Sequence, residues 1–266
     1  MILDTIASST KKRVEKSKRK APLYDLISQI YCNGGIQRFN VRENFAFENV
    51  LKGEGISFIC EVKKASPSKG IISEGFPYQN IAKEYEEAGA SAISVLTEPD
   101  YFKGMDFHLG EISGTVNIPV LRKDFIVDEY QIYESKILGA DAVLLICRLL
   151  STDMLKKYIG ICDELGLSAL VEAHTKEEVI SAVKAGARVI GVNNRDLGTF
   201  KVDIQNCIRL RNYVPEGIVY VAESGIRTRE DISMLEKAGV DAVLIGEALM
   251  RSSDKKAMLS CLKGSN

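Results

Sequence analysis

The feature that most limits the fold of this chain is a phrase that recurs along it: a helix-like segment, a glycine, and then a short strand-like run. The phrase appears at residues 88–95, 138–145, 165–171, 185–192 and 238–245. In each copy the glycine suits the position just after a helix, and the run that follows is apolar or β-branched. These runs lack strict alternation, which is typical of parallel strands covered on both faces. The chain is therefore expected to consist of repeated strand–helix units.

Three further runs of strand length, at residues 58–63, 118–122 and 219–222, raise the number of predicted strands to eight. The recurring glycines are about 20 to 27 residues apart, or double that, which suits βα units. Eight such units predict a single (β/α)8 TIM barrel over residues 1–266, with 1–50 as an N-terminal helical extension over the barrel mouth. An open doubly wound sheet is the main alternative, but no G-x-G-x-x-G or P-loop motif supports it.

Composition narrows the function classes. The formal net charge of −1 gives no overall field that would draw the molecule to nucleic acid or to an anionic membrane. No apolar run approaches the roughly 20 residues that span a bilayer, and no apolar signal core opens the chain, so a cytoplasmic protein is expected. The six cysteines show no C-x-x-C spacing and are expected to be reduced core thiols. With two histidines and no histidine–cysteine cluster, no metal site is predicted.

The N-terminal segment is basic, with seven lysines and arginines between residues 11 and 20. Ile2, Leu3, Ile6 and Val14 are spaced for a helix with a thin apolar stripe, which predicts a helix packed against the domain. An RNA-binding arm is the alternative, but no aromatic residues are interleaved with the basic ones.

Charged and polar residues gather where the predicted strands end. Glu61 and Lys63 lie two residues apart at the end of the first strand, so both side chains point to the same face. Opposite charges on one face of a buried strand are costly unless they are paired or used. The other strand ends carry a similar set: Arg122, Lys123 and Asp124; Glu172; Asn193, Asn194, Arg195 and Asp196; Glu223, Ser224 and Gly225; Gly246 and Glu247.

In a barrel the carboxyl ends of the strands meet at one mouth, where active sites are built. Each of these residues alone is also compatible with a loop charge facing water, but the whole set predicts a site. Lysine among carboxylates suits proton transfer around a bound anion, with lysine as acid and glutamate as base. Gly225 and Gly246 follow the seventh and eighth strands, where their backbone N–H groups suit a phosphate. The residues alone thus predict a phosphate-binding barrel with acid–base chemistry.

Five motifs then carry a family resemblance. They are EVKKASPSKG at 61–70, VLTEPDYFKG at 95–104, LRKDFIVD at 121–128, GVNNRDL at 191–197 and VAESGI at 221–226. Together with the opening ILDTI at 2–6, they resemble the indole-3-glycerol phosphate synthase family in order and over essentially the whole chain. The resemblance implies a lyase of tryptophan biosynthesis. It would close the ring of 1-(2-carboxyphenylamino)-1-deoxyribulose 5-phosphate with decarboxylation and dehydration, using no metal or organic cofactor.

The resemblance also implies catalytic roles. Lys123 matches the general acid, Lys63 the lysine that holds the substrate carboxylate, and Glu172 the residue assigned to dehydration. Glu61 would keep the two lysines charged and oriented, since a nearby opposite charge favours the ionised form. Asn193 matches a residue that positions the substrate and intermediate.

Binding roles follow in the same way. The substrate phosphate is expected at one end of the site and the anthranilate ring at the other, against an apolar wall. Arg195 would position the substrate, and Glu223 with Ser224 would line the floor. The phosphate site is expected at Ser66, Gly225 and Gly246, and the wall at Pro67, Phe102 and Phe125.

Two positions depart from the commonest family pattern. Glu247 stands where a small residue is usual, so only its backbone N–H is expected to contact phosphate. His174 stands where some members carry asparagine, and it is either a hydrogen-bonded loop histidine or a substrate contact.

Two other functions stay open. One is another phosphate-binding barrel enzyme, such as the isomerase one step earlier in the pathway, which uses a cysteine–aspartate pair. The other is a non-catalytic barrel that binds a phosphorylated ligand or a pathway partner. The expected partner is a small phosphorylated substrate, and weak association with other tryptophan-pathway enzymes is a further alternative.

Overall fold

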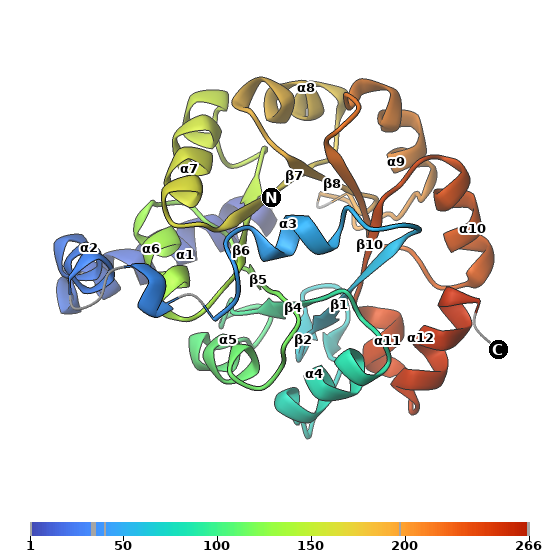
Figure 1. Cartoon of the computed structure of the whole chain (residues 1–266), viewed down its shortest axis with the longest axis horizontal. Helices are drawn as coiled ribbons and strands as arrows, with labels where there is room; N and C mark the ends of the chain where they lie inside the picture. Colours follow the sequence, from blue (N-terminus) through green and yellow to red (C-terminus); the bar gives the residue numbers. More distant parts are fainter. Residues whose placement is uncertain (1, 33–35, 40, 197, 265–266) are drawn as a thin grey trace.

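The centre of the molecule is a closed barrel of eight parallel strands, seen in a computed structural model that describes residues 2–32, 36–39, 41–196 and 198–264 (Figure 1). The barrel strands are β1 (Ser57–Val62), β4 (Ala92–Leu96), β5 (Val120–Lys123), β6 (Ala142–Ile146), β7 (Ser168–Ala173), β8 (Val189–Asn193), β9 (Val219–Glu223) and β10 (Ala242–Ile245). Each strand pairs with the next, and β10 closes on β1. The (β/α)8 prediction is confirmed, and an open sheet is excluded. Leu197, the last residue of the fourth motif, lies outside the described residues.

Helices surround the barrel, one after each strand and a second, α12, after the last (Figure 1). They are α4 (Tyr78–Glu87), α5 (Asp106–Ser113), α6 (Tyr130–Ile137), α7 (Thr152–Glu164), α8 (Lys176–Ala185), α9 (Gln205–Leu210), α10 (Arg229–Lys237), α11 (Glu247–Arg251) and α12 (Lys255–Lys263). A short turn, η2 (Arg211–Tyr213), extends α9, and a two-stranded hairpin, β2 (Ala65–Ser66) with β3 (Gly70–Ile71), follows β1 at the mouth.

The recurring glycine ends a helix in every copy of the phrase. All five glycines adopt a left-handed backbone with φ between 66° and 87°, which side chains on other residues disfavour. The residue after each glycine donates its backbone N–H to the carbonyl five residues earlier, as Ala90 does to Tyr85 at 2.9 Å. This bond satisfies a helix carbonyl that would otherwise lack a partner. The five glycines are Gly89, Gly139, Gly166, Gly186 and Gly239.

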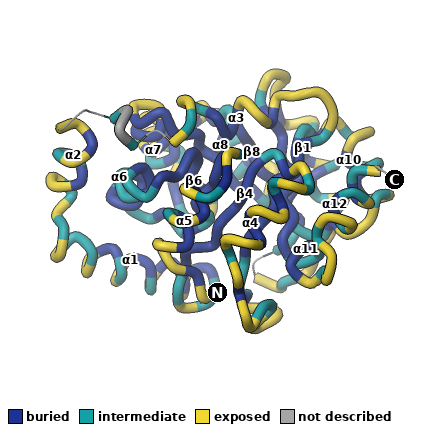
Figure 2. Tube along the Cα trace, turned by 60° about the horizontal axis from the view of Figure 1, so that its bottom comes forward, coloured by how far each residue is buried: buried dark blue, intermediate teal, exposed yellow. Residues whose placement is uncertain are grey.

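The N-terminal extension covers both ends of the barrel. Helix α1 (Ile2–Lys20) lies at the mouth, whereas α3 (Ala46–Val50) lies at the opposite end (Figure 2). Phe47 and Leu51 are fully buried against apolar residues of the barrel interior. Between these helices, α2 (Leu23–Tyr31) packs against α6, followed by η1 (Ile36–Phe39). The helix predicted over the mouth is present, and the last part of the extension also closes the far end.

The cysteines only partly match the prediction of core thiols. Cys60, Cys162 and Cys207 are buried, and Cys147 is partly buried. Cys32 and Cys261 are exposed, so the prediction is wrong for these two: Cys32 follows the last turn of α2, and Cys261 lies on the outward face of α12. No helix within the described residues is long and apolar enough to cross a membrane.

Candidate active site

Four charged side chains form one layer at the barrel mouth, because each follows an inward-facing apolar residue by two positions. Side chains alternate between the two faces of a strand, so residues two apart share a face. Ile59, Leu121, Leu170 and Val221 belong to the apolar cluster inside the barrel. The residues two places further on are Glu61, Lys123, Glu172 and Glu223. Four side chains from alternate strands are the usual composition of a barrel layer, and here that layer carries charge.

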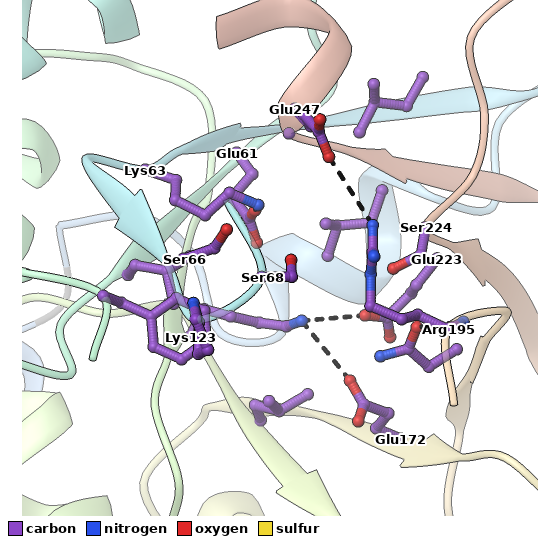
Figure 3. A pocket seen from close by; sticks show the side chains of 18 of the residues that line it. Glu61, Lys63, Ser66, Ser68, Lys123, Glu172, Arg195, Glu223, Ser224 and Glu247 are labelled. Atoms are coloured by element: carbon purple, nitrogen blue, oxygen red, sulfur yellow. Dashed lines mark hydrogen bonds and ion pairs between the residues drawn. The ribbon is translucent and has the colours of Figure 1, made fainter. Parts of the chain in front are cut away.

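Lys123 lies at the centre of this layer. Its Nζ is 2.9 Å from Glu223 Oε2 and 3.5 Å from Glu172 Oε2 (Figure 3). Burial alone would lower the pKa of Lys123, but Glu223, Glu172 and Glu61 together raise it above its ordinary value. The side chain is therefore an ammonium ion at neutral pH, with acceptors on two sides.

Glu61 and Lys63 are paired, as their spacing predicts. Lys63 Nζ donates a hydrogen bond to Glu61 Oε1. Burial alone would raise the pKa of Glu61, but Lys63 and Lys123 hold it below its usual range. Gly246 leaves the space for this pair, because a Cβ there would collide with Glu61 Oε1 and lie 3.0 Å from Lys63 Nζ. The glycine after β10 therefore makes room for a carboxylate as well as exposing backbone.

Glu223 is 1% exposed and forms the floor of the site. Burial raises its pKa, Glu172 and Glu61 add to the rise, and Lys123 opposes it. Gly191 lies against it, since a Cβ there would collide with Glu223 Oε1. The role of Gly191 was missed from the sequence, although a glycine inside a strand is a known sign of close approach by another group.

One end of the cavity is polar, and it includes the residues where the sequence predicts a phosphate. Ser66 and Ser68 line it from the β1 side, and Gly225, with φ of 86°, lines it from the loop after β9. The Glu247 side chain also faces this end: its carboxylate is 3.7 Å from Arg195 Nη2 (Figure 3). The same carboxylate is 3.6 Å from Lys69 Nζ. A carboxylate thus occupies the neighbourhood where the sequence predicts a phosphate.

The opposite wall is apolar. The rings of Phe102 and Phe125 are 5.9 Å apart between centroids, in a tilted arrangement. Pro67 lines the same cavity, as do Ile2, Leu3 and Ile6 from α1. The contribution of α1 was not assigned from the sequence, although its apolar stripe is the signal that marks it.

One cavity brings together all fifteen residues to which the resemblance gives a catalytic or binding role. They are Glu61, Lys63, Ser66, Pro67, Phe102, Lys123, Phe125, Glu172, Asn193, Arg195, Glu223, Ser224, Gly225, Gly246 and Glu247.

Two other polar residues near the mouth have structural partners. His174 Nδ1 is 2.7 Å from the carbonyl oxygen of Asn193, and its Nε2 is 3.5 Å from Asp196 Oδ2, so both ring nitrogens have a partner within the chain. Arg122 points out of the barrel, where it pairs with Asp106 and Glu134 at 2.7 and 2.8 Å. Of the charged residues at the end of β5, Lys123 is therefore the one whose side chain faces Glu172 and Glu223.

Comparison with known proteins identifies the family of the chain. The family model of indole-3-glycerol phosphate synthase matches residues 3–262. The chain belongs to the indole-3-glycerol phosphate synthase family. The indole-3-glycerol phosphate synthase of Ruminiclostridium cellulolyticum is 58% identical over 265 residues, covering 100% of both chains. That of Lachnoclostridium phytofermentans is 52% identical over 269 residues, covering 99% of each. The chain is thus an indole-3-glycerol phosphate synthase family enzyme, a lyase of tryptophan biosynthesis.

Distant solved structures share the barrel. A 3-hexulose-6-phosphate synthase superposes with a TM-score of 0.65 at 12% identity, covering 79% of this chain and 99% of that one. A thiamine phosphate pyrophosphorylase from Pyrococcus furiosus gives a TM-score of 0.59 at 18% identity, covering 82% and 96%. At these identities the likeness concerns the fold alone.

Proposed function

We propose that this indole-3-glycerol phosphate synthase family enzyme closes the indole ring of 1-(2-carboxyphenylamino)-1-deoxyribulose 5-phosphate. The products are indole-3-glycerol phosphate, carbon dioxide and water. The observation that carries this proposal is the Lys123 ammonium, held between Glu172 and Glu223 at a mouth that has an apolar wall on one side and cations on the other. One bound substrate can then reach a general acid, a general base, an apolar surface for its ring and cations for its phosphate.

The two ends of the cavity set the orientation of the substrate. The phosphate would bind near Ser66, Gly225 and Gly246, with Arg195 beside it. The anthranilate ring would lie against Phe102 and Phe125, with its carboxylate at Lys63. Holding both ends brings the ring carbon towards the ribulose carbonyl carbon. The reacting atoms then meet without a further loss of translational and rotational entropy.

Lys123 is the proposed general acid for ring closure. As the ring carbon attacks the carbonyl carbon, a carbon–carbon bond forms, and Lys123 donates a proton to the carbonyl oxygen. The bond to the carboxylate then breaks, and its electron pair restores the aromatic ring as carbon dioxide leaves. Glu61 favours the charged form of both lysines before the proton is transferred, as its pairing with Lys63 and its effect on Lys123 support.

Dehydration completes the reaction. The hydroxyl formed from the carbonyl takes a proton from solvent and leaves as water, and the adjacent ring carbon loses one proton to give the indole double bond. We assign the base role to Glu172, which lies 3.5 Å from Lys123, so that a proton can return to the lysine. Asn193 would orient the intermediate from the end of β8.

The two alternative functions fit the site less well. A phosphate-binding protein needs no lysine held between two buried carboxylates. The isomerase reaction would use a cysteine at the end of the first strand, where this chain has Glu61 and Lys63. We further propose that the enzyme acts in the cytoplasm as a single domain on a small phosphorylated substrate. Packing of the basic helix supports a non-RNA role for α1, since Arg13 and Lys18 pair with Asp124 and Asp128.

The direct test is to mix the purified, EDTA-treated chain with 1-(2-carboxyphenylamino)-1-deoxyribulose 5-phosphate. Indole fluorescence should rise without added metal, with one carbon dioxide released for each indole formed. A flat trace from a folded protein would contradict the proposed reaction.

A further inference from the structure

Arg13 of α1 connects the N-terminal helix to two buried carboxylates beneath the mouth. Its Nη2 lies 2.9 and 3.0 Å from Oδ1 and Oδ2 of Asp124, and its Nη1 lies 3.7 Å from Oε1 of Glu98. Both carboxylate side chains are 0% exposed, whereas that of Arg13 is 25% exposed. One guanidinium therefore pairs with two buried carboxylates, and these carboxylates come from different barrel loops.

Asp124 holds the loop that carries the proposed acid. It directly follows Lys123, and it accepts hydrogen bonds from Thr97 Oγ1 at 2.9 Å and from the backbone N–H of Phe125 at 2.8 Å. Burial alone would raise the pKa of Asp124, but Arg122 and Arg13 hold it below its usual value. The charge of Arg13 thus acts on the residue next to Lys123.

Glu98 organises the second loop. Its carboxylate accepts the backbone N–H groups of Asp100, Tyr101 and Phe102, at 3.0, 2.7 and 3.0 Å. The loop shaped in this way carries Phe102, whose ring faces Phe125 from the loop after β5. Arg13 therefore contacts both Asp124, which follows Lys123, and Glu98, which shapes the loop that carries Phe102.

We propose that Arg13 is a positioning residue whose guanidinium joins the loops after β4 and β5. It thereby fixes the position of Lys123 relative to the rings of Phe102 and Phe125. Arg122 cannot replace it fully, because that guanidinium already pairs with Asp106 and Glu134 and lies 3.4 Å from Asp124. Removing one partner of a buried charge pair leaves the other uncompensated, and the loops would shift to reach water or another cation.

The test compares Arg13→Gln with Lys16→Gln, which removes the same charge from an exposed position on the same helix. Misplacing a reacting group by about an ångström can cost on the order of a hundredfold in rate. We expect Arg13→Gln to lower kcat at least tenfold, with a smaller rise in KM, while Lys16→Gln stays within about twofold of the wild type. Arg13→Lys keeps the positive charge but lacks the planar guanidinium, so its kcat should lie between those of Arg13→Gln and the wild type.

Rates are taken per folded molecule, with the folded fraction measured by near-UV circular dichroism, so that lost stability is not counted as lost catalysis. An Arg13→Gln enzyme with normal kcat, or with a raised KM alone, would overturn the proposal. Arg13→Lys with the same kcat as Arg13→Gln would also overturn it. The proposal rests on the proposed function: an inactive wild type refutes the reaction itself, whereas an active wild type with a fully active Arg13→Gln refutes only this role.

Discussion

Lys123 Nζ lies 2.9 Å from Glu223 Oε2, while Glu223 Oε1 has no hydrogen-bond partner among the residues that the structure describes. A buried carboxylate with one oxygen unsatisfied is costly to keep ionised. Burial accordingly raises the pKa of Glu223 to about 7. The acceptor beside the proposed acid therefore changes its own protonation near neutral pH.

The first prediction concerns the pH dependence of stability. The folded-state pKa of Glu223 is raised from 4.5 to about 7, so its favourable contribution is complete below pH 4.5 and is lost as pH rises through 7. Glu223→Gln cannot titrate. The free energy of unfolding of the wild type, relative to this variant, should fall between pH 5 and about 8. Urea titrations at several pH values measure it, and parallel stability curves would contradict the assignment.

A second prediction uses the space at Gly246. An alanine there would push Glu61 away from Lys63, because its Cβ would collide with Glu61 Oε1. We expect kcat/KM to fall at least tenfold. The matched control is Gly160→Ala in α7, where nothing lies within 4 Å of the added Cβ.

That control should keep full activity and gain about 0.5–1 kcal/mol of stability, because alanine suits a helix interior better than glycine. Steady-state kinetics and thermal melts of both variants measure the difference. Full activity in Gly246→Ala would show that the Glu61–Lys63 pair is not needed in the observed geometry.

A third prediction concerns the end of the cavity where the phosphate is proposed to bind. The Glu247 carboxylate lies 3.6 Å from Lys69 and 3.7 Å from Arg195, two cations that a phosphate would also use. Glu247→Gln removes the competing charge, so inorganic phosphate should inhibit turnover at about threefold lower concentration, with a smaller difference at high salt. Weaker inhibition by phosphate in this variant would mean that the carboxylate holds the cations in place.

Much of this site is predictable because it follows local rules. Apolar runs ending in charge mark the strand ends, and the two-residue period places Glu61, Lys123, Glu172 and Glu223 on the inner face. The same period could have excluded Arg122, which shares the outward face of Val120. The helix-ending glycines are predictable for a similar reason, since a left-handed position favours glycine.

Other features depend on contacts between distant segments. Arg13 reaches Asp124 from 111 residues away, and no local pattern pairs them. The five residues of α3 carry too short an apolar pattern to show which end of the barrel they close. The space beside Gly191 is defined by a side chain from the neighbouring strand, so it appears only once the barrel is closed.

The central claim is that Lys123 supplies chemistry rather than affinity. The deciding measurement compares Lys123→Ala with the wild type in single-turnover formation of indole-3-glycerol phosphate and in equilibrium binding of that product. Turnover should disappear while product affinity stays within about tenfold, because the phosphate and ring contacts lie elsewhere in the cavity. Equal loss of binding and turnover, or turnover that survives, would contradict the account.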